Sequence, residues 1–318
     1  MIEQMDVEKY MEKDEYRKQI DELEIRIGTL QRELKELNIP VMIVFEGVDA
    51  SGKGTMINRM ISSMDPRGFQ VFTLNDHNEE EQMRPYFWRF MTKTPERGRI
   101  HIYDQSWYQG VFHKEINVED ANHFEGMLSK DGYLIVKFFL IISKEEQKRR
   151  LKKLEKKKET RWRVTKKDKK HHKEFKSRLK KYDEILIHSD TDYAPWTVVE
   201  STDKRYATCK ILFTLLERME RAVRENKEKE PVKEKEAVKE KNTGFSSGVL
   251  NRVDLSLELS REEYEAQKKE YQKRLYRLQS QMYRERVPVV LAFEGWDAGG
   301  KGGAIKRLTQ AMDPRVKQ

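Results

Sequence analysis

The sequence lacks the features of membrane and secreted proteins. It has no apolar run of about 18 residues, so no segment is predicted to span a membrane. The N-terminus, MIEQMDVEKYMEKDEY, is acidic and polar and has no apolar signal-peptide core. Cys209 is the only cysteine, which excludes an intramolecular disulfide framework and suits a reducing compartment. These absences predict a cytoplasmic protein with no membrane partner.

Basic residues, by contrast, are abundant and concentrated in one segment. Residues 144–181 contain 20 Lys and Arg against 6 Asp and Glu, a net charge of +14 that exceeds the +9 of the whole chain. Such a concentration predicts a polyanionic partner for this segment. Within it, the candidate phosphate-binding residues are Arg149, Arg150, Lys153, Arg161 and Arg163. His171 and His172 have no metal-ligand spacing and are expected to be exposed.

A glycine-rich loop follows a short apolar run that begins at Val41. The run predicts a buried strand, and a helix is predicted to begin near Lys53. The spacing from Gly47 to Gly52-Lys53 is that of a phosphate-binding P-loop, in which backbone N–H groups and a helix N-terminus face an oxyanion. The lysine supplies a charge that can follow the transferred phosphoryl group. The candidate phosphate-binding positions of the loop are Gly47, Ser51, Gly52, Gly54 and Thr55.

The position after the loop lysine is Gly54, where a hydroxyl residue usually holds Mg²⁺. A metal ion must therefore be held by carboxylates. Asp49 lies inside the loop, and Asp104 ends a predicted strand over residues 99–104. Acidic residues at the carboxyl end of a strand point into the ligand-binding crevice of an open α/β sheet. Both aspartates are therefore candidate Mg²⁺ ligands and catalytic residues, together with Lys53.

Strands and helices are expected to alternate along the chain as far as residue 224. This order predicts an α/β fold with a doubly wound, mostly parallel sheet flanked by helices. An amphipathic helix over residues 7–37 could pack on the core or support a homo-oligomer. An aromatic helix over residues 84–91 is expected to leave Arg84 and Arg89 facing a cleft. The other predicted strands cover residues 69–74 and 132–142, and residues 193–199 are predicted to form a turn that leads into a last strand. The other predicted helices cover residues 118–128, 144–158, 166–186 and 204–223.

The P-loop pattern occurs a second time, at a constant offset of 248 residues. Asp297 and Lys301 correspond to Asp49 and Lys53, and Met312-Asp-Pro-Arg315 repeats Met64-Asp-Pro-Arg67. The predicted domains are 1–224, with a lid at about 144–186, a charged linker at 225–250, and the start of a second copy at 251–318. The second copy has no counterpart of Asp104. We therefore expect a fragment of a longer two-copy protein, or a last element that docks on the first domain.

Several motifs together carry a resemblance to the polyphosphate kinase 2 family. The tandem arrangement is similar to that of its two-domain polyphosphate:AMP phosphotransferases. The resemblance covers about residues 15–223 and again residues 263–315. The motifs are Phe45-Glu-Gly-Val-Asp-Ala-Ser-Gly-Lys53, Tyr86-Phe-Trp-Arg-Phe90, Tyr103-Asp-Gln-Ser-Trp-Tyr108, Ser143-Lys-Glu-Glu-Gln147 and Tyr193-Ala-Pro-Trp196.

The resemblance implies a P-loop kinase-like fold with a basic helical lid. It also implies Mg²⁺-dependent phosphoryl transfer from inorganic polyphosphate to a nucleotide. The simplest acceptor is AMP, which becomes ADP. Asp49 and Asp104 would organise Mg²⁺, Lys53 would stabilise the transferring phosphoryl group, and the lid would border the polyphosphate channel. Arg84 and Arg89 would lie on the nucleotide side.

One departure from the family pattern leaves alternatives open. The family has Asp-Arg-Ser-Trp-Tyr-Asn-Arg where this chain has Asp104-Gln-Ser-Trp-Tyr-Gln-Gly110, so two arginines are absent. Cationic clamps of this kind are worth on the order of 10³-fold in rate. The first copy could therefore be a degenerate phosphate-binding scaffold for a catalytic second copy. An ATP-using nucleoside-monophosphate kinase is disfavoured by the basic lid, and nucleic-acid binding by its few aromatic residues.

Overall fold

The computed structural model describes residues 2, 5–74, 76–156, 158, 161, 164–228, 254, 256–296 and 299–309. The chain divides into two compact units, Met1–Glu234 and Lys235–Gln318, and each is described by itself. Among the described residues, no helix is long and apolar enough to cross a membrane.

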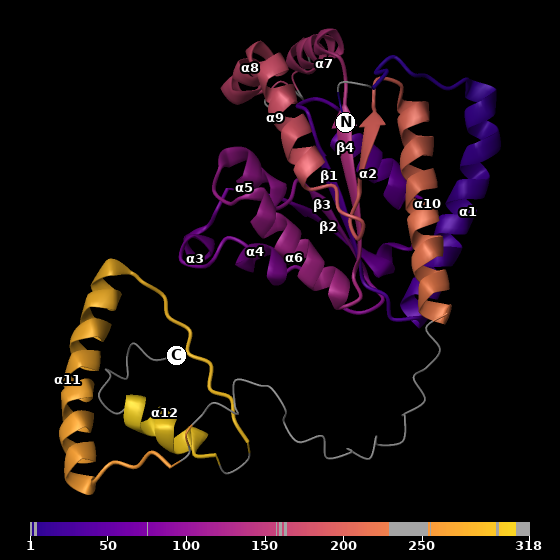
Figure 1. Ribbon diagram of the computed structural model, residues 1–318. Helices are drawn as coiled ribbons and strands as arrows, with labels where there is room; N and C mark the ends of the chain where they lie inside the picture. The colour runs from indigo at the N-terminus through magenta and orange to yellow at the C-terminus, as the bar shows by residue number, and fades with distance from the viewer. Residues whose placement is uncertain are drawn as a thin grey trace. The chain divides into compact units, whose positions relative to one another are not determined.

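The first unit is built on a five-stranded sheet, as the sequence predicts (Figure 1). The strand order is β2-β3-β1-β4-β5, and all four pairings are parallel. The central strand therefore pairs on both sides, with Val44 opposite Tyr103 of β3 and Lys137 of β4. The strands are β1 (Val41–Gly47), β2 (Phe69–Thr73), β3 (Ile100–Asp104), β4 (Leu134–Ile141) and β5 (Trp196–Glu200).

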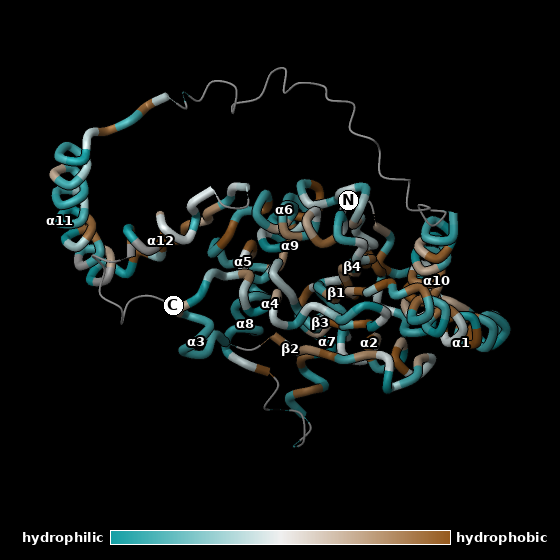
Figure 2. The backbone as a smooth tube through the Cα atoms, turned by 90° about the horizontal axis from the view of Figure 1, so that it is seen from below, coloured by the Kyte–Doolittle hydropathy of each residue, from teal (hydrophilic) through white to brown (hydrophobic). Residues whose placement is uncertain are grey.

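Both faces of the sheet are buried, which explains the continuous apolar run before the loop. Val41, Ile43 and Phe45 point into one core cluster, and Met42 and Val44 point into the other. All five are completely inaccessible to solvent. Figure 2 shows the hydrophobic strands in the middle of the unit. Hydrophilic residues lie along the helices outside them.

One face of the sheet is covered by α1 (Lys13–Glu36), α2 (Lys53–Ile61) and α10 (Lys204–Glu228). The first and last of these lie side by side (Figure 1). Lys227 Nζ of α10 lies 2.8 Å from Glu33 Oε2 of α1, and Arg26 is paired with Glu220. The apolar stripe of α1 is thus covered within its own unit, so it gives no argument for self-association.

The other face is covered by α4 (Trp88–Met91), α5 (Tyr108–His113), α6 (Val118–Lys130) and α9 (Phe175–His188).

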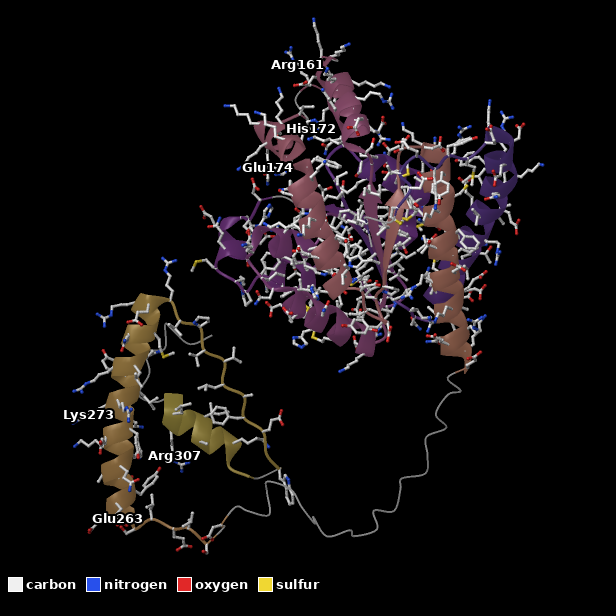
Figure 3. The ribbon with its side chains drawn as sticks, turned by 45° about the horizontal axis from the view of Figure 1, so that its top comes forward. Arg161, His172, Glu174, Glu263, Lys273 and Arg307 are labelled. Carbon is white, nitrogen blue, oxygen red and sulfur yellow. The ribbon has the colours of Figure 1, made fainter. Side chains whose placement is uncertain are left out.

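Two predicted helices differ from the structure. The helix predicted over residues 166–186 is broken at Glu174 into α8 (Lys166–Lys173) and α9 (Figure 3). The helix predicted over residues 84–91 begins only at Trp88. Pro85 disfavours helical backbone at Arg84, and a turn in which the Trp88 N–H donates to the Pro85 carbonyl at 2.9 Å precedes the helix. Two short elements, the 3₁₀ turn η2 (Pro66–Gly68) and α3 (Glu79–Gln82), precede β2 and α4 respectively.

The basic segment predicted to form a lid contains α7 (Lys144–Lys156), α8 and α9, which follow the carboxyl end of β4. Arg161 marks the connection after α7 in Figure 3. The lid helices therefore begin at the edge of the sheet where the glycine-rich loop also lies. This is the edge at which open α/β sheets bind ligands.

The second unit contains α11 (Arg261–Glu285) and α12 (Lys301–Thr309). The repeat of the β1 sequence before its loop predicts a strand there as well, but this is wrong for the described backbone, because residues 287–296 have no strand structure. A strand needs hydrogen-bonded neighbours, and β1 has them on both sides. The repeated turn at 312–315 and the predicted linker, apart from the end of α10, lie outside the described residues.

Candidate functional site: a cavity beside the glycine-rich loop

The glycine-rich loop connects β1 directly to α2. Gly47 has a φ of +147°, and a Cβ built on it would lie 2.3 Å from the carbonyl oxygen of Leu140. Gly52 has a φ of +99° and is the N-cap of α2. Lys53 extends back over the loop, with Nζ 3.4 Å from the Gly47 carbonyl oxygen. The two glycines thus permit a tight turn against β4 that presents a helix N-terminus.

A cavity of about 740 Å³ opens beside this loop. It is bounded by the start of α2, the carboxyl ends of β2 and β3, the helix α7, and the loop before α10. Acidic side chains, basic side chains and backbone N–H donors therefore line the same cavity. Its lining residues include Gly52, Gly54, Thr55, Asn58, Thr73, Asp104, Arg149, Arg150, Lys153, Thr202 and Lys204.

Asp104 is the carboxylate of this cavity that best suits a cation. It ends β3 and is half-buried, and within the described chain its side chain accepts no hydrogen bond. Burial raises the pKa of Asp104, and the positive charge of Lys53 partly opposes this rise. A carboxylate that lacks donors is stabilised by a cation, and hard oxygen ligands are those that Mg²⁺ prefers. Among the described residues no three His, Cys, Asp or Glu side chains gather to hold a metal ion, so Asp104 fits a magnesium ion that takes its other ligands from water and substrate oxygens.

Asp49, the second predicted metal ligand, contacts the lid. Its Oδ2 lies 2.8 Å from His171 Nδ1 of α8, and the neighbouring His172 lies 2.7 Å from Gln147 Oε1 of α7. The expectation that both histidines are exposed is wrong, because the side chain of His171 is only 13% exposed. Asp49 Oδ1 has no hydrogen bond within the described residues, so one oxygen remains available to a metal ion.

The predicted basic residues have different surroundings. Arg149 is largely exposed at the cavity and donates two hydrogen bonds to Glu146, while Lys153 makes no ion pair with the described residues. The guanidinium of Arg150 is directed to backbone carbonyls. Arg161 is exposed but does not line this cavity, and Arg163 lies outside the described residues.

Lys204 also lines the cavity, and the sequence analysis missed it. It is the first residue of α10 and follows the carboxyl end of β5 by four residues. The rule that located Asp104 at the end of a strand would have located Lys204 as well. Within the described residues it forms no ion pair, so its charge is available to an anion.

Glu46 is a fully buried carboxylate directly before the loop. Its Oε1 accepts hydrogen bonds from the Ser106 N–H (2.8 Å) and Oγ (2.9 Å), and its Oε2 accepts one from Gln109 Nε2 (2.6 Å). Burial raises the pKa of Glu46 to about 7, although Lys53 and the Ser106 donors lower it. Glu46 thus connects β1 to the turn that follows Asp104.

A second buried carboxylate supports the same turn from behind. Glu125 of α6 accepts hydrogen bonds from Trp107 Nε1 (3.0 Å) and the Tyr108 hydroxyl (2.9 Å). Lys137 of β4 donates to Glu125, to the Tyr108 hydroxyl and to the Ser189 carbonyl, each at 2.8 Å. All three ammonium donors are therefore satisfied inside the protein. This network fixes the segment after Asp104 to the sheet and to two helices.

Arg84 and Arg89 were predicted to face a cleft. Arg89 does not, because its side chain is 4% exposed and lies 3.2 Å from Glu81 Oε2. Arg84 is about half exposed, lies 3.3 Å from Glu80 Oε1 and stacks over the Trp88 ring. Only Arg84 is therefore accessible in this conformation.

The two positions that lack the family's arginines are not equivalent. Gln105 has a φ of +69° and is partly exposed. Gly110 is buried under Tyr86, and a Cβ at position 110 would lie 2.4 Å from Tyr86 Cζ. The Tyr86 ring thus fills the space that a side chain at 110 would need.

The loop of the second unit has a similar local form. Lys301 Nζ contacts the carbonyl oxygens of Gly295 and Trp296, the latter at 2.9 Å. Gly300 has a φ of +79°, and α12 begins at the next residue. Asp297 lies outside the described residues.

Comparison with known proteins confirms the predicted resemblance. The sequence profile of the family "Polyphosphate kinase 2 (PPK2)" matches residues 10–228 and 258–318. A polyphosphate:AMP phosphotransferase of Pseudomonas aeruginosa is 32% identical over 99% of this chain, and one of Pseudomonas syringae is 30% identical over 99%. The chain spans 66% and 65% of the length of these two relatives.

Solved structures support the same fold. A crystal structure described as a putative polyphosphate kinase 2 from Pseudomonas aeruginosa has a TM-score of 0.66 and 32% identity, and the match covers 70% of this chain and 50% of that one. Polyphosphate kinase 2 from Arthrobacter aurescens has a TM-score of 0.65 at 24% identity, over 69% of this chain and 85% of the other. The predicted P-loop kinase-like α/β fold is confirmed.

Proposed function

Because this chain belongs to the polyphosphate kinase 2 family, we propose that it transfers a phosphoryl group from inorganic polyphosphate to a nucleotide, with AMP as acceptor and ADP as product. One observation carries the proposal. The loop, Asp104 and the cations Arg149, Lys153 and Lys204 line a single cavity at the carboxyl edge of the sheet. Phosphoryl transfer depends chiefly on positioning and charge neutralisation, and this cavity offers groups for both.

We assign roles to the residues by the charges that they offer. Lys53 would follow the transferred phosphoryl group, and the free N–H groups at the start of α2 would bind its oxygens. Asp49 and Asp104 would hold Mg²⁺, which neutralises charge on phosphate oxygens when bound. Arg149, Lys153 and Lys204 would bind the polyphosphate chain, and Arg84 would lie on the nucleotide side. The single cysteine favours action in the cytoplasm.

An assay of the purified chain tests this proposal. Mg²⁺ and AMP are supplied with either polyphosphate or ATP, and ADP is measured. We expect ADP from polyphosphate, and a decrease on the order of 10³-fold in Lys53→Ala, because its charge is lost at the transferring group. ADP formed with ATP alone as donor would contradict the proposal.

A second candidate function is a phosphate-binding scaffold without turnover. It is favoured by Gln105 and Gly110, which stand where the family has arginines, and by the Tyr86 ring over Gly110. Calorimetric titration with polyphosphate distinguishes the two functions. Tight binding that Lys53→Ala weakens, without any ADP formed, would support the scaffold.

A further inference from the structure

Among the described residues, Arg150 of α7 makes more hydrogen bonds than any other side chain at the cavity. Its Nε donates to Glu146 Oε1 at 2.6 Å. Its Nη1 donates to the carbonyl oxygens of Ala50 (3.2 Å) and Ser51 (2.8 Å). Its Nη2 donates to the carbonyl oxygens of Ser201 (2.7 Å) and Thr202 (3.1 Å). A guanidinium has five N–H donors, so all five are used within the protein.

These bonds join three neighbouring strand ends. Ala50 and Ser51 belong to the loop after β1, Glu146 lies in the first turn of the helix after β4, and Ser201 directly follows β5. The strands β1, β4 and β5 are adjacent in the sheet. Arg150 therefore connects the phosphate loop to the base of the lid and to the loop before α10.

The contact also sets the direction of a peptide group in the phosphate loop. The Ser51 carbonyl and the Gly52 N–H belong to one planar trans unit and point in opposite directions. Arg150 Nη1 (2.8 Å) and Ser201 Oγ (3.0 Å) both donate to the Ser51 carbonyl, and Arg150 also binds the Ser201 carbonyl, so it holds both partners of this peptide group. The Gly52 N–H is therefore turned away from α7, and it makes no hydrogen bond with the described residues. The preceding residue, Ala50, has a φ of +59°, which is unfavourable for alanine. The guanidinium thus stabilises a strained turn and neutralises carbonyls that would repel an anion.

We propose that Arg150 is a positioning residue of the phosphate loop, and not the phosphate ligand that the sequence suggests. Its role in catalysis rests on the proposed function. Its neighbour Arg149 is the contrasting case, since it is 70% exposed and keeps donors for an anion. Two consecutive arginines on one helix would thus serve different purposes.

Arg150→Lys and Arg150→Gln test the proposal, with Arg221→Gln on α10 as a matched control away from the cavity. Arg221 is exposed and paired only with Glu225 among the described residues. Lysine keeps the charge but has three donors and cannot span four carbonyls. We expect kcat for ADP formation to fall at least tenfold in both Arg150 variants, with KM for AMP within threefold of wild type. The dependence of polyphosphate affinity on salt should not change.

Hydrogen exchange of the loop amides gives a readout that does not need turnover. The Ser51 N–H donates to the Val48 carbonyl at 3.1 Å, and the Ser201 N–H donates to the Ile141 carbonyl at 2.8 Å. We expect these two amides to exchange at least tenfold faster in Arg150→Lys, and to be unchanged in Arg221→Gln. A wild-type chain that forms no ADP would refute the proposed function, whereas unchanged exchange would refute the positioning role.

Two further outcomes would overturn the inference. If Arg150 binds phosphate, Arg150→Gln should reduce the slope of log affinity against log salt by about one, as the loss of an ionic contact does for other polyanions. Unchanged kcat in Arg150→Lys would also contradict a positioning role. Should Arg150→Gln fail to fold, as judged by thermal unfolding, Arg150→Lys decides the question, because it retains the positive charge and the aliphatic part of the side chain.

Discussion

In the first unit, the residues before the glycine-rich loop form the centre of a sheet, whereas their counterparts in the second unit face solvent. Met42 is 0% exposed and its counterpart Val290 is 93% exposed. Phe45 is 0% exposed and Phe293 is 40% exposed. The two segments, VMIVFEG at 41–47 and VVLAFEG at 289–295, are identical at four of seven positions and apolar at the other three. Both therefore carry a strand-like apolar pattern, and the difference in exposure reflects what surrounds them.

The loops themselves differ much less. Each has a glycine with positive φ directly before a helix of 9 residues, Lys53–Ile61 in one unit and Lys301–Thr309 in the other. In each, the lysine ammonium returns to the carbonyl of the first loop glycine. Turn and helix-start geometry therefore follows from local sequence, while the strand depends on partners distant in the chain. Matched substitutions in the two units can test this distinction.

The largest difference in lost stability is expected between alanine substitutions of Phe45 and of its counterpart Phe293. Phe45→Ala should lower the free energy of unfolding by about 3–5 kcal/mol, because it leaves a cavity between β1 and the helices on its face. Phe293→Ala should cost less than about 1 kcal/mol, because that ring is partly in water already. Urea denaturation of both variants measures the two values. Equal losses would mean that Phe293 is buried in solution.

A smaller difference, in the pH dependence of stability, is expected between Glu46 and Glu294, which follow Phe45 and Phe293. Burial raises the pKa of Glu46 to about 7 from an ordinary value of 4.5, so between these values the folded state binds more protons than the unfolded state. Stability should therefore fall as pH rises from 4.5 to 7, by at most ~3 kcal/mol from this group. Glu46→Gln removes this dependence, and Gln109 can turn its amide to accept a hydrogen bond from the new side chain.

Urea midpoints at pH 5 and pH 7.5 measure the effect. Glu294→Gln is the matched control, because Glu294 is exposed and should leave the pH dependence of the wild type unchanged. A Glu46→Gln variant that loses as much stability as the wild type over this range would show that Glu46 is ionised throughout.

The fold, the position of the glycine-rich loop and the place of Asp104 at the end of β3 could be predicted from the sequence. These depend on hydrophobic patterning and on glycine spacing, which are local. The sequence was insufficient for contacts made across long separations, such as His171 with Asp49 or Arg150 with Ser201. Charge composition assigned Arg150 to the polyanion, but only the structure shows its five donors bound to the protein. Residue type alone thus does not predict the role of a side chain such as Arg150, whose partners come from distant parts of the chain.

The smallest expected effect concerns the two positions where the family has arginine. In Gln105→Arg, the partly exposed side chain can be replaced without changing the backbone, and we expect kcat for ADP formation to rise by roughly tenfold through added positive charge near the phosphates. Gly110→Arg should instead lower stability by about 1–3 kcal/mol, because its Cβ would overlap the Tyr86 ring.

The combination Gly110→Arg with Tyr86→Ala separates these two effects. Removal of the ring provides space, so stability lost in Gly110→Arg should be partly recovered, and any gain in kcat from the arginine should become visible. Steady-state kinetics and urea midpoints of the three variants provide the measurements. If Gly110→Arg alone is as stable as wild type, the Tyr86 ring moves freely, and the space above Gly110 is open to a side chain or a ligand. If it is destabilised and the double variant recovers, the packing of Tyr86 on Gly110 explains why position 110 of the first unit tolerates no arginine.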